Sequence, residues 1–138
     1  MKIFRPDGSQ FFPDKKELFG TLLFLKGLFE PQTYFLYFKD RPRITGKLED
    51  YLRMPSVYMR LLTSSHDYPD MDQLAAYPRS LTYGQCAQFM LYNLRIVYSQ
   101  GGWELFVERW INGTSYRMVT RMLEQFDEIP EFNPEDFR

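Results

Sequence analysis

The stretch SQGGWELFVERWINGTSYRMV, residues Ser99–Val119, decides the architecture of this chain. Within it, apolar side chains recur at the i, i+3, i+4, i+7 and i+8 positions that one face of an α-helix brings together. These side chains belong to Trp103, Phe106, Val107, Trp110 and Ile111. Gly101-Gly102 precedes them and Asn112-Gly113 follows, and such pairs are typical of turns. We therefore predict a short amphipathic helix between two turns, with both tryptophans facing the core.

Helices are also predicted on either side of this stretch. On the N-terminal side, Thr82 is a typical N-cap for a helix that continues to about Ser99 and ends at the glycine pair. Its predicted core face comprises Tyr83, Cys86, Met90, Leu94 and Val97. On the C-terminal side, Thr114 or Ser115 is the expected cap of a last helix. Its predicted core face comprises Met118, Val119, Met122, Leu123 and Phe126.

The N-terminal residues predict a β-hairpin followed by a helix. Short apolar runs at Ile3-Phe4 and Gln10–Phe12 flank a Pro-Asp-Gly turn. Asp14, with Glu17 three residues later, has the pattern of a capping box. Gly20 and Gly27 lower the intrinsic propensity of this helix by roughly 1 kcal/mol each, so tertiary packing has to stabilise it. Small residues also permit the close approach of a neighbouring element. The apolar residues at helical spacing are Leu18, Phe19, Leu22, Leu23 and Phe29.

The middle of the chain is less regular. Residues 32–39, QTYFLYFK, favour a strand by their Tyr, Phe and Thr content, paired with the hairpin, although Pro31 could equally open a helix. Short helices are predicted at residues 45–54 and 56–63, divided by Pro55. The composition of residues 64–73 predicts a loop, and residues 70–77 are expected to add a short helical turn before Pro78.

Together these elements predict a mainly α protein, a compact helical single domain with a short N-terminal β-hairpin or small β-sheet, with an α+β arrangement as the alternative. A chain of 138 residues is long enough for one hydrophobic core without metal or disulfide staples. We expect a globular domain over residues 1–129, with the hairpin, first helix and expected strand in 1–44 and helices in 45–129. Residues 130–138 are expected to form an acidic, extended tail.

The composition narrows the classes of function. Aromatic residues make up 18% of the chain, which fits a ring-rich core, a sticky interface, or both. The net charge of −1 provides no field to hold nucleic acid or an anionic membrane, so neither is an expected partner. The apolar segment Leu18–Phe29 contains Lys26 and is too short for a membrane span. A single cysteine, Cys86, favours a reducing compartment, and we expect a cytoplasmic protein.

Catalytic and metal-binding chemistry has little support in the sequence. The strongest polar cluster is His66–Asp72, one imidazole and three carboxylates, but it lacks the glycine and terminal Glu of a calcium loop, and a solvated loop is the preferred interpretation. Cys86 lies at an apolar helix position and is expected to be buried and inert. Glu104 and Glu108 form a like-charged i, i+4 pair, which we interpret as a solvated face. We expect no cofactor, no metal and no enzymatic activity.

Binding to another protein is the function that remains. Leu105 lies off the apolar stripe of its helix and is a candidate for an exposed contact. In the tail, the rings of Phe132 and Phe137 alternate with acidic residues. This pattern is suited to docking into a basic groove lined by aromatic rings on a partner. The alternatives are a frayed tail and a tail that folds back on its own domain. The acidic candidates are Glu131, Glu135 and Asp136.

Three functional hypotheses follow, in order of preference. The first is a non-catalytic module that acts by stoichiometric complex formation, such as an immunity protein or an inhibitor of an enzyme or toxin. The second is a small structural or assembly protein, such as a phage or virion component, that forms homo-oligomers. The third is a metal-dependent enzyme using the His66–Asp72 loop.

Overall fold

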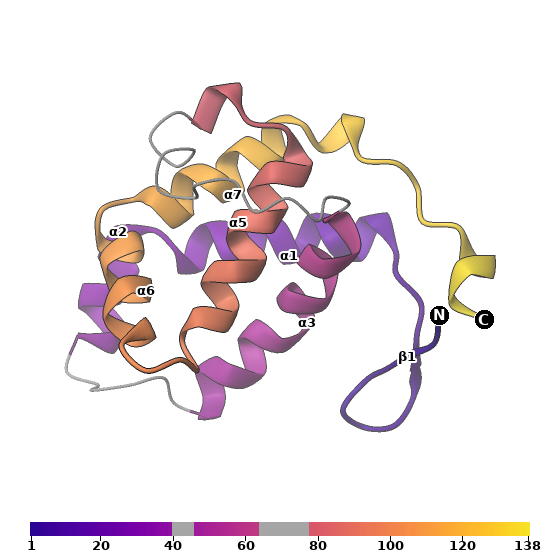
Figure 1. The fold of residues 1–138 in the computed structure, drawn as a ribbon, viewed down its shortest axis with the longest axis horizontal. Helices are drawn as coiled ribbons and strands as arrows, with labels where there is room; N and C mark the ends of the chain where they lie inside the picture. Colours follow the sequence, from indigo (N-terminus) through magenta and orange to yellow (C-terminus); the bar gives the residue numbers. More distant parts are fainter. Residues whose placement is uncertain (40–45, 64–77) are drawn as a thin grey trace.

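The computed structural model describes residues 1–39, 46–63 and 78–138 (Figure 1). The chain is mainly α, with one two-stranded antiparallel sheet at its N-terminus, as predicted. The elements run in the order β1 (Ile3–Phe4), β2 (Gln10–Phe11), α1 (Lys15–Leu28), α2 (Pro31–Thr33), the π-helical turn η1 (Tyr34–Phe38), α3 (Gly46–Leu62), η2 (Pro78–Ser80), α5 (Tyr83–Ile96), α6 (Gly102–Ile111), α7 (Thr114–Glu124), η3 (Phe126–Glu128) and η4 (Pro134–Phe137). The predicted loop at 64–73, the helical turn at 70–77 and the cluster His66–Asp72 lie outside the described residues.

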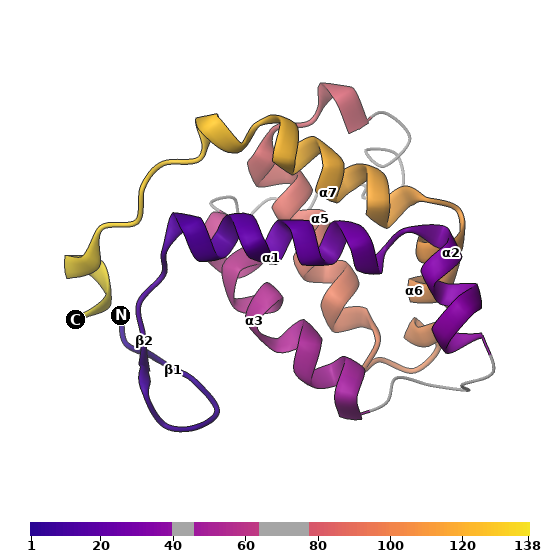
Figure 2. The same ribbon diagram turned by 180° about the vertical axis from the view of Figure 1, so that it is seen from behind.

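The helices pack around α5, which contacts α3 on one side and α7 on the other. α1 lies across α7 and α3, and α6 packs at the end of the molecule against α5, α7 and α2 (Figures 1 and 2). Within the described ranges, no helix combines the length and the apolar character needed to cross a membrane.

The predicted capping and turn signals around α6 are confirmed with one correction. The Thr82 hydroxyl accepts from the backbone N–H of Gln85, whose side chain accepts from the N–H of Thr82, which completes a capping box on α5. Gly101 and Gly113 both have left-handed φ angles, 77° and 84°, that favour glycine. The prediction that Thr114 or Ser115 caps α7 is wrong, because α7 begins at Thr114 and its N-cap is Gly113. The Asn112 side chain accepts from the Thr114 N–H at 2.9 Å.

The aromatic stripe of α6 lies in the core, as predicted, except at its end. Trp110 and Phe106 are fully buried, and Trp103 is half-buried with its ring stacked on that of Phe106. Ile111 was expected on the core face but is 37% exposed, because it is the last residue of α6 and lies at the edge of the core that buries Trp110. The buried residues of α5 and α7 include Cys86, Met90, Leu94, Met118, Val119 and Met122, all predicted.

The N-terminal hairpin forms with Ile3 opposite Phe11, and the Asp14 side chain caps α1 by accepting from the Lys16 N–H. The expected capping box is not closed. Instead, the Glu17 carboxylate accepts from the Tyr58 hydroxyl at 2.9 Å and pairs with Arg5 at 3.3 Å. A tertiary partner on α3 therefore replaces the local backbone N–H as the donor to this carboxylate.

The predicted core stripe of α1 is right in part. Leu18, Leu22 and Phe29 are fully buried, but Phe19 and Leu23 lie on the opposite, solvent-facing side. Residues at i and i+1 of a helix are separated by 100°, so a run of apolar neighbours cannot all face one core.

The prediction of a strand at residues 32–39 is wrong. The segment continues as a helix from Pro31 at the first position of α2 into the π-helical turn η1. The rings of Tyr34 and Phe38 both lie against Trp110, with centroids 5.5 and 5.3 Å from it. Side chains at i and i+4 meet one neighbour when the backbone is helical. Packing on Trp110 therefore outweighs the strand propensity of these residues.

The predicted break at Pro55 is also wrong, because α3 runs without interruption to Leu62. Pro55 is itself buried and falls in register with the core stripe of the helix, which repeats at spacings of four and three residues. The buried residues of this stripe are Leu48, Leu52, Pro55, Met59 and Leu62. Burial of this continuous stripe offsets the backbone hydrogen bond that proline cannot donate.

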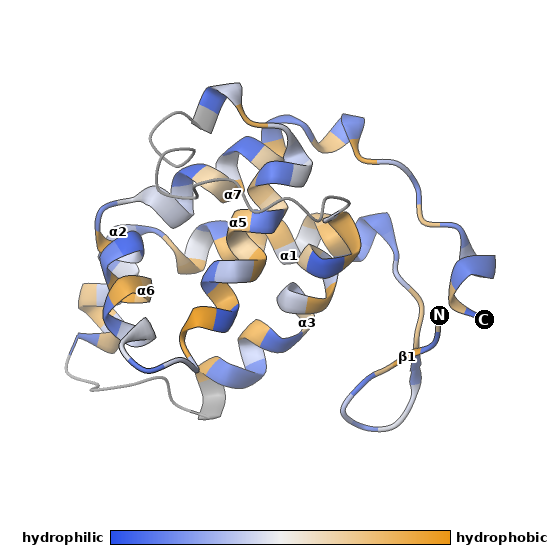
Figure 3. Ribbon diagram, viewed as in Figure 1, coloured by the Kyte–Doolittle hydropathy of each residue, from blue (hydrophilic) through white to orange (hydrophobic). Residues whose placement is uncertain are grey.

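The C-terminal residues pack beside the N-terminal hairpin, which is the folded-back alternative for the tail (Figures 1 and 2). Phe137 is only 6% exposed, and its carbonyl accepts from the Gln10 side chain at 2.6 Å. The amino group of Met1 donates to the carbonyl of Asp136 at 2.7 Å. The segment is largely hydrophilic, with isolated hydrophobic positions (Figure 3), and those positions, Ile129, Phe132 and Phe137, are the ones that turn inward.

Candidate protein-binding surface

The residues predicted as binding candidates fall into two separate places. Phe132 and Phe137 lie together, with ring centroids 6.4 Å apart, and Phe132 also contacts Tyr58 of α3 at 6.0 Å. Glu131, Glu135 and Asp136 are exposed around them. Leu105 is half-buried on α6, at the opposite end of the molecule (Figure 1). The two phenylalanines thus hold the tail on its own domain, and they would have to detach to dock elsewhere.

The residues considered for catalysis within the described ranges are Cys86 and the pair Glu104 and Glu108. Burial raises the pKa of the Cys86 thiol to about 12, so it stays protonated at neutral pH and is a poor nucleophile. Among the described residues, no group of three or more His, Cys, Asp or Glu side chains is arranged to hold a metal ion. Glu104 and Glu108 are both exposed on α6.

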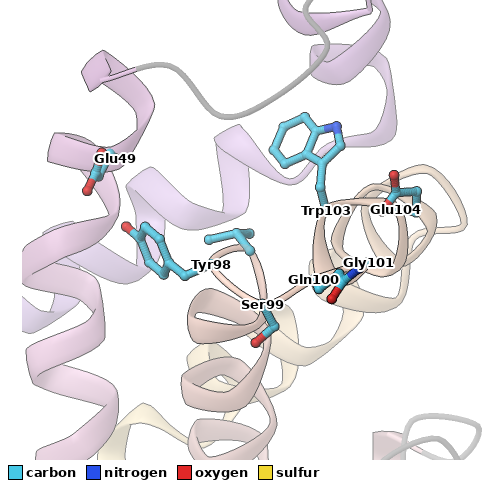
Figure 4. Close-up of a pocket in the computed structure, with 8 residues that line it drawn as sticks. Glu49, Tyr98, Ser99, Gln100, Gly101, Trp103 and Glu104 are labelled. Carbon is cyan, nitrogen blue, oxygen red and sulfur yellow. The ribbon is translucent and has the colours of Figure 1, made fainter.

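A hollow of about 420 Å³ opens between the first turn of α3 and the junction of α5 with α6 (Figure 4). Glu49 of α3 and Glu104 of α6 enter it from opposite sides, with the rings of Tyr98 and Trp103 between them. Burial, followed by the carboxylate of Glu49, raises the pKa of the Tyr98 hydroxyl above its usual value. The two carboxylates do not converge on one point, so the hollow lacks the paired geometry of an acid–base site.

Among the described residues of the helical body, the most exposed cluster of apolar side chains lies on η1. Phe35, Leu36 and Tyr37 are 50%, 73% and 67% exposed. They are consecutive, and they are flanked by Tyr34 and Phe38, whose rings are anchored on Trp110. We call these three outward residues the η1 knob. π-Helical turns are rare and occur frequently at functional sites.

The η1 knob is held in place by more than its own turn. The indole N–H of Trp110 donates to the carbonyl of Glu30 at 3.3 Å, which fixes the start of α2 on α6. The Thr33 hydroxyl donates to the carbonyl of Gly27 at 3.0 Å, which ties the same segment to the end of α1. An apolar surface held this way loses little conformational entropy on binding, so more of the contact energy appears as affinity.

The η1 knob was not predicted from the sequence, because the composition of residues 32–39 favours a strand. In a strand, alternate side chains face the same way, and the run of three exposed residues would not exist. The signal that was present is Pro31 at the first position of a helix, followed by Tyr34 and Phe38 four residues apart.

Comparison of the chain with protein-family models, with curated proteins and with solved structures gave no match.

Proposed function

We propose that this protein is a non-catalytic binding module that forms a stoichiometric complex with another protein through the η1 knob. The observation that carries the proposal is the exposure of Phe35, Leu36 and Tyr37 on a turn anchored by Trp110. Large apolar and aromatic side chains dominate the binding energy of protein interfaces, and pre-organised ones cost least to immobilise. Three adjacent side chains of this kind are enough for a central hot spot.

The tail is the less favoured surface for the same role. Phe137 is buried and Phe132 is half-buried, so docking through the tail would first have to break the contacts with Gln10 and Tyr58. The η1 knob needs no such rearrangement. A stiff, single-site binder in a reducing cytoplasm fits an inhibitor or immunity protein, whose partner would be an enzyme or toxin held inactive in the complex.

The test is affinity capture from an extract of the native host at two salt concentrations, with identification of the bound protein by mass spectrometry. The double variant Leu36→Ser, Tyr37→Ser removes the apolar contact while changing only exposed positions, where substitutions alter stability by about 0.5 kcal/mol or less. Phe4→Ser is the matched control, because Phe4 is 60% exposed on the hairpin, at the opposite end of the molecule (Figure 2).

We expect the wild type and Phe4→Ser to retain one partner in a fixed ratio, and the double variant to lose it. Retention of the same partner by the double variant would reject the η1 knob as the contact. Addition of the purified protein to an enzymatic partner should then reduce that partner's activity at equimolar ratio, and an unchanged activity would reject the inhibitor hypothesis while leaving the binding function intact.

A further inference from the structure

α1 is apolar on its solvent side as well as on its core side. Four buried leucines form the core side. The opposite side exposes 42% of Phe19, 48% of Leu23 and 41% of Phe24. We call the set Phe19, Gly20, Leu23, Phe24 and Gly27 the outer face of α1. A helix that is apolar all round is normally covered on all sides, whereas α1 lies at the surface between α3 and α7 (Figure 2).

No close contact among the described residues requires glycine at either of the two glycine positions of this face. Both adopt helical backbone angles, and a Cβ added at Gly20 or at Gly27 would meet nothing within 4 Å. Glycine weakens a helix relative to alanine, so its presence at two exposed helical positions needs a reason. The missing side chains leave hollows beside Phe19, Leu23 and Phe24, and such hollows allow a second helix to approach closely.

We propose that a second copy of this chain covers the outer face of α1, in an antiparallel contact of the two α1 helices about a two-fold axis beside Leu23. This arrangement is self-complementary, as a two-fold interface must be. Leu23 lies level with Leu23 of the second copy. Phe19 precedes Leu23 by four residues, and Gly27 follows Leu23 by four residues. The ring of Phe19 in each copy therefore lies level with the hollow at Gly27 of the other copy.

Charge selects the antiparallel orientation. Lys16, in the first turn of α1, and Glu30, two residues past its end, are both exposed, and each lies seven residues from Leu23. Antiparallel pairing therefore brings Lys16 level with Glu30 of the second copy, and this happens twice in the dimer. Parallel pairing would oppose like charges instead. Within the described part of the chain, neither residue forms an ion pair of its own.

The exposed apolar area of the outer face of α1 sets the expected affinity of the dimer. Phe19, Leu23 and Phe24 together expose on the order of 250 Å² per copy, taking typical side-chain areas. Tyr51 of α3 extends the face, since it is 45% exposed and its ring lies 5.6 Å from that of Phe24. This apolar core is small for a permanent dimer, so we expect a dissociation constant on the order of micromolar.

The charge test uses sedimentation velocity over roughly a hundredfold range of concentration around micromolar. Lys16→Glu and Glu30→Lys should each weaken the dimer by about threefold or more, and the double variant Lys16→Glu, Glu30→Lys should restore it. Neither substitution removes a side-chain cap, since Glu30 makes none and Lys16 contributes only its backbone N–H to the cap of α1. Lys2→Glu is the matched control, with the same charge change at an exposed residue of the N-terminus, and should leave dimerisation unchanged.

Gly27→Gln tests the packing independently of charge. The added side chain has open space in the monomer, so the melting temperature should stay the same or rise, while the dimer should be lost because the ring of Phe19 no longer has its hollow. A chain that stays monomeric throughout the concentration range overturns the proposal and leaves another protein or a lipid surface as the occupant of this face. A dimer unaffected by Gly27→Gln, or a double charge variant that does not recover, overturns the proposed register. The η1 double variant should dimerise normally, which separates this proposal from the proposed function.

Discussion

Trp110 is the residue on which we expect this fold to depend most. It is fully buried, and the centroid of its ring lies within 5.8 Å of the centroids of four other aromatic rings, those of Phe29, Tyr34, Phe38 and Phe106. These rings come from the C-cap of α1, from η1 and from α6, so one side chain joins elements that are far apart in sequence. Substitution Trp110→Ala should therefore destabilise the whole domain and also release the segment that carries the η1 knob.

The expected decrease in stability follows from the contacts that Trp110→Ala removes. Removal of a buried tryptophan side chain costs about 3–5 kcal/mol in transfer and cavity energy. The hydrogen bond from the indole N–H to the carbonyl of Glu30 adds little, about 0.5 kcal/mol, because Glu30 is exposed and water can replace the donor. We expect the free energy of unfolding to fall by about 4 kcal/mol in Trp110→Ala. It should fall by about 2 kcal/mol in Trp110→Phe, because phenylalanine keeps one ring in the cluster.

The assay is urea unfolding followed by circular dichroism and by the fluorescence of Trp103, which remains as the reporter in both variants. Hydrogen exchange of the amides in residues 31–38 gives a second readout and should accelerate in Trp110→Ala. A loss below about 1.5 kcal/mol, or equal losses for the two variants, would refute the argument that the ring cluster holds η1 on α6.

Three further predictions concern other contacts. Ser115→Ala should cost about 1–3 kcal/mol in thermal unfolding, because it leaves the buried Asn93 amide without the acceptor that it now meets at 3.0 Å, and a neutral result would contradict this. Phe137→Ala should cost about 2 kcal/mol and make the tail cleavable by protease in the otherwise folded protein, whereas a resistant tail would show that Phe137 does not anchor it. The Cys86 thiol has a folded-state pKa of about 12, above its usual value of 9.0, so its contribution to stability is complete below pH 9 and is lost as the pH rises toward 12, at about 1.4 kcal/mol per pH unit. Unfolding measured from pH 8 to 11 should show a smaller alkaline loss for Cys86→Ala than for the wild type, and equal slopes would be evidence against a buried thiol.

The tertiary partners of single residues explain why the η1 knob could not be predicted from the sequence. Phe35, Leu36 and Tyr37 have the composition of a strand, and only the position of Trp110, more than 70 residues later, makes them an exposed helical turn. The tail residues Phe132 and Phe137 alternate with acidic residues, a pattern that is equally compatible with docking on the protein's own hairpin. Nothing in the order of these residues separates the two outcomes, because both bury the same rings.

The features that the sequence determined by itself are those whose partners lie within a few residues. The hairpin turn, the N-cap of α5 at Thr82 and the turns at Gly101-Gly102 and Asn112-Gly113 depend on local backbone geometry and were predicted correctly. Tertiary structure decided the rest: whether Pro55 interrupts α3, which donor Glu17 accepts from, and which side of α1 faces water. The physical reason is the same in each case, since burial against distant elements is worth several kcal/mol and exceeds the local preferences, which are about 1 kcal/mol or less for most residues and about 3 kcal/mol for proline inside a helix.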